Sequence, residues 1–234
     1  EGSYSSRQLA GHPALEEVLC LAAAKSSCAC SASTRCATLA SGSRHDTARL
    51  WELGTDQQSA RMFARRGSVH CVALVGGALA TGSGASGQAA VVRRTDAGEW
   101  RDVAIPVLRQ GSRVTGLAWL TSGVLLTVSL DRTLRQIEWP FGLGMNRCGV
   151  KTFRNAHLLA PRAITALAHD FYFVSGGDDG AVMLWDRHLA RTSTFEHGDD
   201  PVCSLANGGN DNTFASGHAA CTKLWDPRAR GRPT

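Results

Sequence analysis

FVSGGDDGAVMLWD, at residues 173–186, is the stretch that decides the fold: a short apolar run ending in Ser-Gly, a turn, and a second run ending in Leu-Trp-Asp. The same order returns at residues 39–52 and 214–226, which close with Leu50-Trp51-Glu52 and Leu224-Trp225-Asp226. Recurrence at a period of roughly 40–50 residues is typical of a repeat architecture. The chain is therefore expected to be built from repeated structural units.

A second pattern lies upstream of these runs and occurs five times. A β-branched residue opens each copy, an aliphatic residue follows three positions later, and Ala comes next; the copies are residues 18–22, 69–73, 114–118, 164–168 and 202–206. Short apolar runs between turn signals predict strands that are buried on both faces. Two further strands follow each copy, outer strands are expected at residues 60–64, 102–107, 151–154 and 191–195, and no stretch has helical periodicity.

These repeats resemble the WD-repeat family of β-propellers, and the resemblance covers nearly all of the chain. It implies an all-β fold in a single domain, residues 1–234, with five recognisable blades at about 10–65, 66–108, 109–155, 156–196 and 197–228. The family usually has seven blades and the chain begins without Met, so we expect the five blades to be part of a larger ring. A closed five-blade ring is the alternative, in which residues 5–9 pair antiparallel with residues 222–225 and hide both sheet edges.

In this family a His, a strand Ser or Thr, a turn Asp and a strand Trp form a hydrogen-bonded tetrad that satisfies buried polar groups within a blade. The matching positions are His157, Ser175, Asp179 and Trp185 in the fourth repeat, His12, Ser41 and Trp51 in the first, Thr127 and Asp131 in the third, and His197, Ser216 and Trp225 in the fifth. We interpret them as structural, because a single hydrolase triad would not recur from repeat to repeat. No catalytic residue is predicted.

Partner binding is expected on loops and strand ends. The insertions at residues 23–35 and 140–161 exceed ordinary strand connections, and long loops in compact domains are commonly functional or disordered. The second insertion adds apolar side chains suited to a protein contact. The candidate partner-binding residues are Phe141, Leu143, Met145, Arg93, Arg94, Trp225, Asp226 and Arg228, the last three from a Trp-Asp-x-Arg sequence that resembles the box of cullin-RING ligase adaptors.

Metal and cofactor chemistry is not supported by the motifs that superficially suggest it. Cys28, Cys30 and Cys36 cluster in the sequence, but no matching Cys or His pair follows to complete a zinc site. Residues 82–87 fit a dinucleotide-binding glycine pattern, yet a strand rather than a helix is expected after them, so we interpret these glycines as turn residues. We expect no metal and no cofactor.

Composition and charge bound the function. The 234 residues carry a net charge of +5 and are 43% hydrophobic, without an apolar run of about 18 residues that would span a bilayer. We therefore expect an intracellular protein, cytoplasmic or nuclear, with no membrane contact. These features favour a non-catalytic scaffold for protein–protein interactions in a multiprotein or ribonucleoprotein complex, with RNA reached through basic loops. The alternatives are a ribosome-assembly factor, which residues 125–139 and 224–228 locally resemble, a substrate receptor of a cullin-RING ubiquitin ligase, and, from another class, an enzyme with a loop-borne site.

Overall fold

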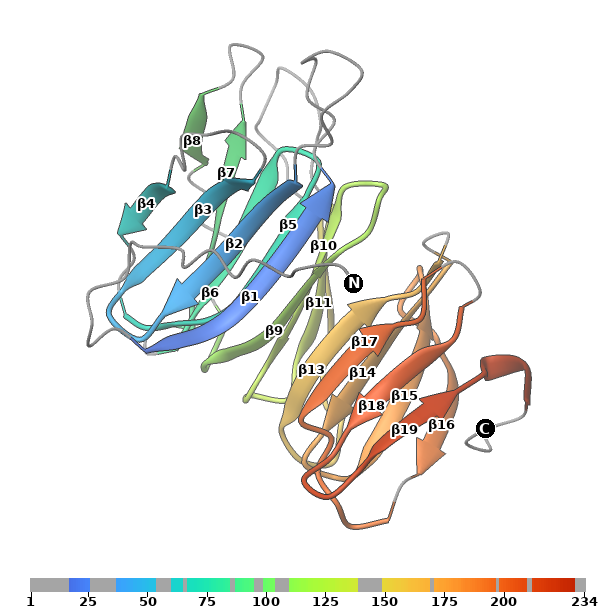
Figure 1. Cartoon of the computed structure of the whole chain (residues 1–234). Helices are drawn as coiled ribbons and strands as arrows, with labels where there is room; N and C mark the ends of the chain where they lie inside the picture. The colour runs from blue at the N-terminus through green and yellow to red at the C-terminus, as the bar shows by residue number, and fades with distance from the viewer. Residues whose placement is uncertain are drawn as a thin grey trace, which may run out of the picture.

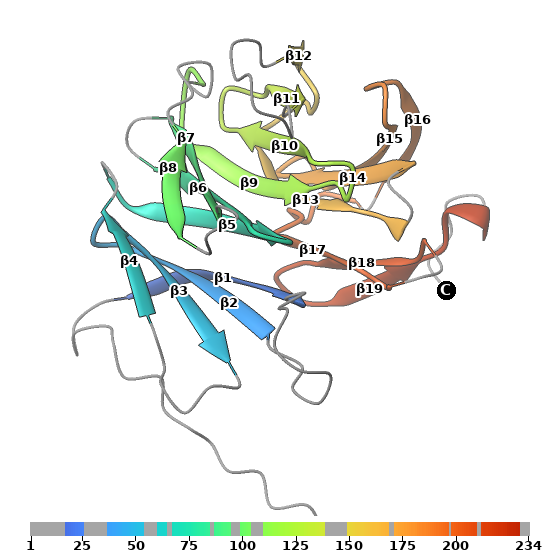
Figure 2. The ribbon, with the colours of Figure 1, turned by 90° about the horizontal axis from the view of Figure 1, so that it is seen from above.

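The computed structural model describes residues 17–25, 37–53, 60–64, 67–84, 87–94, 99–103, 110–138, 149–168, 171–196, 198–209 and 212–229. These residues form five antiparallel sheets that follow one another along the chain as the blades of a β-propeller (Figure 1). Figure 2 shows the sheets fanned around a common centre, with β4, β8, β12 and β16 at the periphery. The all-β fold with five blades that the repeats predict is therefore confirmed.

The strands group by blade as follows. Blade 1 comprises β1 (Val18–Lys25), β2 (Ala37–Ser43), β3 (Thr47–Leu53) and β4 (Ala60–Ala64). Blade 2 comprises β5 (Val69–Val75), β6 (Ala78–Ser83), β7 (Ala89–Arg94) and β8 (Trp100–Val103). Blade 3 comprises β9 (Val114–Trp119), β10 (Val124–Ser129), β11 (Leu134–Glu138) and β12 (Gly149–Phe153). Blade 4 comprises β13 (Pro161–Ala166), β14 (Tyr172–Gly177), β15 (Ala181–Asp186) and β16 (Arg191–Glu196).

Blade 5 has three strands in the described part of the chain: β17 (Ser204–Asn207), β18 (Phe214–Gly217) and β19 (Thr222–Trp225). A short 3-10 helix, Pro227–Ala229, follows β19. No helix among the described residues has the length and apolar character needed to cross a membrane.

The core lies between the blades rather than inside them. The innermost strands pack in series, β1 on β5, β5 on β9, β9 on β13 and β13 on β17. Four apolar clusters fill the spaces between consecutive blades. Because β5, β9 and β13 are each pressed from both sides, small and β-branched residues fit there better than bulky ones.

The Gly of the Ser-Gly and Thr-Gly runs makes room for the next blade. Three glycines each face a valine of the next blade, which starts the inner strand in blades 2 and 3 and lies two residues before it in blade 5. The pairs are Gly42 with Val69, Gly82 with Val114 and Gly176 with Val202, where an added Cβ would lie 2.6, 2.9 and 2.4 Å from the valine Cγ1. Absence of a side chain at a strand position lets another element approach closely. The two sequence patterns therefore meet across the blade interface.

Cysteines on two inner strands fill the same kind of position. The Cys20 thiol donates to the Val69 carbonyl at 3.7 Å, and the Cys71 thiol donates to the Val114 carbonyl at 3.6 Å. Burial raises the pKa of Cys20 to about 12, so this thiol stays neutral and packs as a small apolar residue. In the described ranges no group of three or more His, Cys, Asp or Glu residues is arranged to hold a metal ion, and Cys28, Cys30 and Cys36 lie outside those ranges.

Four strand predictions need correction. The fifth inner strand begins at Ser204 rather than at residue 202. The fourth inner strand begins at Pro161 rather than at residue 164, because Pro161 pairs with Gly177 beside a β-bulge. Proline is tolerated there, since a bulged strand end can lack one ladder donor. The second outer strand starts at Trp100 rather than at residue 102, and residues 104–107 of the predicted strand lie outside the described ranges. The third outer strand starts at Gly149, opposite Glu138, instead of at residue 151.

The series of blades does not return on itself in the described residues. No contact comparable to those between consecutive blades joins β17 to β1. The outer edge of β19 pairs with no described strand. Residues 5–9, which would pair with β19 in a closed five-blade ring, lie outside the described ranges, so that pairing stays a prediction.

Candidate functional site

The four tetrad residues of blade 4 lie in one hydrogen-bonded chain. Ser175 Oγ is 2.8 Å from His157 Nε2 and accepts a hydrogen bond from Trp185 Nε1 at 2.9 Å. His157 Nδ1 lies 3.0 Å from the Asp179 carboxylate, which also accepts from the Leu158 backbone N–H at 2.8 Å. Because an ionised carboxylate only accepts, the N–H at Nδ1 donates to Asp179. Asp179 thereby fastens the β14–β15 turn to the segment that precedes β13.

Hydrogen bonds hold the tetrad carboxylate in its charged form. Burial alone would raise the pKa of Asp179, but the hydrogen bond and charge of His157 and the backbone N–H groups of Leu158 and Ala181 outweigh burial and lower it. The pKa of Asp131 in blade 3 is lowered in the same way, with burial opposed chiefly by hydrogen bonds from Thr133. Both side chains are therefore ionised acceptors at neutral pH.

Blade 3 builds a related network with a residue that the sequence reasoning missed. Gln110 Nε2 donates to Thr127 Oγ1, where blade 4 has its His. Asp131 accepts from the Gly111 backbone N–H at 2.8 Å, as Asp179 accepts from Leu158. The signal was in the spacing, since Gln110 precedes Thr127 by 17 residues and the His of blade 4 precedes its Ser by 18.

Blades 1 and 5 keep the Ser–Trp pair. Trp51 donates to Ser41 Oγ at 3.1 Å, and Trp225 donates to Ser216 Oγ at 2.8 Å. In blade 5 the hydroxyl also lies 3.1 Å from His218 Nε2, a histidine of the β18–β19 turn that the repeat alignment did not single out. His12 and His197 lie outside the described residues.

The partner-binding candidates are scattered, and one of them needs correction. Trp225 is only 1% exposed, so its side chain packs inside blade 5 and cannot contact a partner. The Asp226 carboxylate accepts a hydrogen bond from the Arg228 backbone N–H at 2.9 Å and so stabilises the turn that follows β19. Arg93 and Arg94 are half-buried at the end of β7, far in sequence from that chain end. The remaining candidates, Phe141, Leu143 and Met145, lie outside the described residues.

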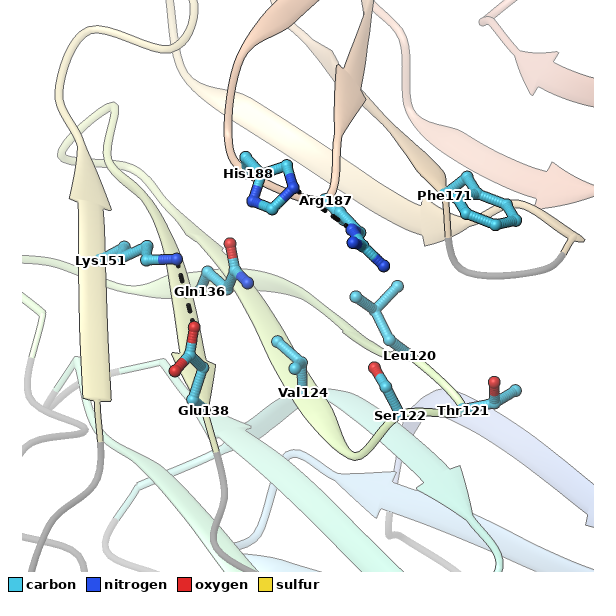
Figure 3. Close-up of a pocket in the computed structure, with 10 residues that line it drawn as sticks. All are labelled: Leu120, Thr121, Ser122, Val124, Gln136, Glu138, Lys151, Phe171, Arg187 and His188. Carbon is cyan, nitrogen blue, oxygen red and sulfur yellow. Dashed lines mark hydrogen bonds and ion pairs between the residues drawn. The ribbon is translucent and has the colours of Figure 1, made fainter.

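A groove of about 460 Å³ between blades 3 and 4 brings together side chains that the sequence did not connect (Figure 3). It lies on the face that carries the β9–β10 and β15–β16 turns. Blade 3 contributes Gln136, Glu138 and Lys151, and blade 4 contributes Phe171, Arg187 and His188. The volume lies within the range of small-ligand pockets. Contributions from two separate repeats explain why sequence motifs did not reveal it.

Gln136 is the unusual residue of this groove. Its side chain is 4% exposed, and Oε1 accepts no hydrogen bond from the described residues. The register places Gln136 opposite Leu126 on the second strand. The third-strand residues at the same register in the other blades are all aliphatic: Leu50, Val91, Leu184 and Leu224. A buried acceptor without a donor costs about 1–3 kcal/mol, so the fold alone gives no reason for an amide at this position.

The blade 4 wall of the groove is held by its own hydrogen bonds. Arg187 Nε donates to His188 Nε2 at 3.3 Å, and the guanidinium lies 6.0 Å from the centroid of the Phe171 ring. The Asp186 carboxylate accepts from the backbone N–H groups of His188 and Ala190, each at 2.8 Å. Leu189 has φ 68° and is buried, which anchors the turn in the core. These contacts place the Arg187 guanidinium beside His188 and near the Phe171 ring.

Comparison with known proteins agrees with this fold. Residues 150–186 match the family described as WD domain, G-beta repeat. The match runs from β12 to the end of β15, so the sequence repeat begins on the outer strand of one blade and ends in the next. One matched WD repeat and a five-bladed β-propeller fold together confirm the resemblance to WD-repeat β-propellers seen in the sequence.

One solved structure illustrates the likeness. A chain in the structure titled "Crystal Structure of Mitotic Checkpoint Complex" has 20% sequence identity and a TM-score of 0.65, with 84% of the present chain covered. The present chain spans 64% of that chain's length. At this identity the likeness concerns the fold alone. No curated protein matches the sequence.

Proposed function

We propose that the protein is a non-catalytic scaffold that holds other proteins in a multiprotein assembly. The observation that carries this proposal is the groove between blades 3 and 4, which combines a buried acceptor, Gln136, with Phe171, a ring that is 57% exposed. Exposed aromatic surface beside polar groups is typical of protein contact sites. A disc of sheets suits this role, because strands fix the faces while turns vary.

The groups that could act in catalysis are engaged in structural networks, which supports a non-catalytic role. Ser175 stands beside His157 and Asp179 in the order of a hydrolase triad, but its side chain is 0% exposed and its oxygen accepts from Trp185. A serine nucleophile has to reach a substrate carbonyl in an open cleft. The buried trio therefore suits a structural role far better than a chemical one.

Affinity capture of the tagged chain from its native source, followed by mass spectrometry, tests the scaffold. We expect a defined set of partner proteins in near-stoichiometric amounts, and we expect Phe171→Ser to lose at least part of that set. Leu158→Ser is the matched control, because Leu158 is 80% exposed at the opposite end of blade 4. A chain that is recovered alone at low salt contradicts the proposal.

The kind of complex to which the scaffold belongs is a further hypothesis, and the same capture experiment distinguishes the alternatives. Release of the partners by nuclease would favour a ribonucleoprotein or a ribosome-assembly role, and recovery of cullin-RING components would favour a ligase receptor. The insertion that contains Phe141, Leu143 and Met145 is proposed as a second recognition element. Deleting residues 141–145 should remove part of the capture without lowering the melting temperature of the blades. Unchanged capture would contradict that assignment.

A further inference from the structure

We infer that the groove between blades 3 and 4 binds an extended segment of a partner protein in which an acidic side chain stands beside an apolar one. This inference rests on the scaffold function proposed above and names the chemistry of its ligand. Three features of the groove carry it: the unpaired acceptor of Gln136, the guanidinium of Arg187, and the exposed ring of Phe171.

The unpaired acceptor, Gln136 Oε1, indicates that the ligand supplies a hydrogen-bond donor. Gln136 lines the groove and its Oε1 is buried without a donor, whereas its blade equivalents, such as Leu184, are aliphatic. An amide at this position is therefore a departure from the repeat that weakens the folded state while the groove is empty. The backbone N–H of an extended peptide is a suitable donor, because peptide segments present such groups at regular intervals.

The charge of the groove indicates that the bound segment carries an acidic side chain. Lys151 is paired with Glu138 at 3.2 Å, whereas no ion pair joins Arg187 to a described carboxylate. Figure 3 shows Arg187 and His188 on one side of the groove and the Lys151–Glu138 pair on the other. Arg187 can form a bidentate, charge-assisted hydrogen bond with a carboxylate. Its position is set in advance by His188 and the Asp186 turn, so little side-chain entropy is lost on binding.

The exposed ring calls for an apolar neighbour in the ligand. Phe171, directly before β14, is 57% exposed and lines the groove. Leu120 and Val124 line the blade 3 side of the groove. Apolar surface of this kind contributes to affinity only when a partner covers it.

A protein ligand fits these features better than RNA does. Glu138 lines the groove and neutralises Lys151, so Arg187 is left as the main anchor for an anion. A nucleic-acid strand needs several cations along its phosphates and aromatic rings on which bases stack. One guanidinium, a neutral acceptor and an apolar wall match a peptide with a single carboxylate instead.

Fluorescence polarisation with synthetic probes tests the inference. The probes are fluorescein-labelled Gly-Ser octapeptides whose central pair is Asp-Leu, Asp-Phe, Glu-Leu or Glu-Phe, their Asn and Gln counterparts, and an oligouridine of similar length. We expect at least one acidic peptide to bind the whole chain about tenfold more tightly than its amide counterpart, which is the scale of one charge-assisted contact. Arg187→Glu should abolish that preference.

Gln136→Leu separates a binding role from a structural one. We expect this variant to bind the acidic peptide several-fold more weakly and yet to melt at a higher temperature, because leucine is the residue type that other blades carry there. A structural glutamine would lower the melting temperature instead. Arg154→Glu is the matched charge control, since Arg154 is exposed and lies outside the groove. It should leave peptide binding unchanged.

Three results overturn the inference: equal binding of acidic and amide peptides, including no binding of either; equal binding by wild type and both groove variants; or tighter binding of oligouridine than of any peptide. The proposed scaffold function is judged separately by affinity capture. If Arg187→Glu and Gln136→Leu retain all partners, the scaffold stands and the groove is not its contact. If wild type captures nothing, the scaffold itself fails.

Discussion

Blades 4 and 5 carry the same Leu-Trp-Asp ending, but the leucine is buried in one blade and exposed in the other. Leu184 in blade 4 is 6% exposed, because blade 5 packs against it. Leu224 in blade 5 is 58% exposed, because no described blade follows β19. The first blade shows the same effect in reverse: Leu21 is 64% exposed, whereas Val72, at the same register in blade 2, is 8% exposed. The motif specifies a strand, and the neighbouring blade decides whether its face becomes core.

The largest difference in stability between the two blades is expected when a charged side chain replaces this leucine. Leu184→Asp would bury a carboxylate among apolar side chains and should cost at least about 3 kcal/mol of unfolding free energy. Leu224→Asp makes the same chemical change on an exposed strand and should cost less than about 1 kcal/mol. Urea unfolding of both variants measures the contrast. Equal losses would mean that another element covers Leu224 in solution.

The tetrad is expected to matter in blade 4, where all four of its members are present. Asp179→Ala leaves His157 and the Leu158 N–H without their acceptor and should cost about 1–3 kcal/mol. Blade 5 has Ala220 in the corresponding turn, and its Ser216 contacts Trp225 and His218 without a carboxylate. Asp199→Ala is the control, because it removes an exposed carboxylate from the segment between blades 4 and 5. Thermal unfolding of Asp179→Ala at the wild-type temperature would contradict a stabilising tetrad.

A smaller contrast is expected at the two equivalent strand glycines. A Cβ on Gly176 would lie 2.4 Å from Cγ1 of Val202 in blade 5, so Gly176→Ala should force the interface apart and cost about 1–3 kcal/mol. A Cβ on Gly217 would meet only its own blade, nearest the Ser204 hydroxyl, which can rotate away. Gly217→Ala should therefore stay within about 1 kcal/mol of wild type. Chemical denaturation compares the two, and a larger loss at Gly217 would show that its face is covered.

The smallest effect is the pH dependence of the tetrad. The pKa of Asp179 is lower in the folded chain than its ordinary value, so its charge stabilises the fold above that ordinary value. This contribution is lost as the pH falls through the lowered pKa and the carboxylate becomes protonated. The stability difference between wild type and Asp179→Asn should therefore shrink between pH 7 and about pH 3. Denaturant titrations at both pH values check this, with Asp199→Asn as control, and a constant difference would contradict it.

Residues close in sequence were predicted well, because their roles depend on local pattern. The strand Ser and Trp of a blade lie ten residues apart in blade 4, and their hydrogen bond follows from a hairpin whose length is visible in the sequence. Gln110 was missed because the tetrad pattern has His at this position, although the glutamine side chain supplies an N–H donor as well. The start of β13 was misplaced because two registers put an aliphatic residue at the fourth position of the inner-strand pattern. Ile164 fills that position for residues 161–165, and Leu167 fills it for residues 164–168. Only the pairing with β14 decides between the two registers.

By itself the sequence determined the fold class, the order of strands in each blade and the positions of the buried Ser–Trp pairs, because these depend on alternation and spacing within about 45 residues. The tertiary structure alone decided which faces are covered and where a groove forms. Leu184 and Leu224 have nearly the same local sequence and opposite exposure, and Gln136 meets Arg187 only because blades 3 and 4 stand side by side. Burial and site chemistry depend on contacts between repeats, which no local pattern contains.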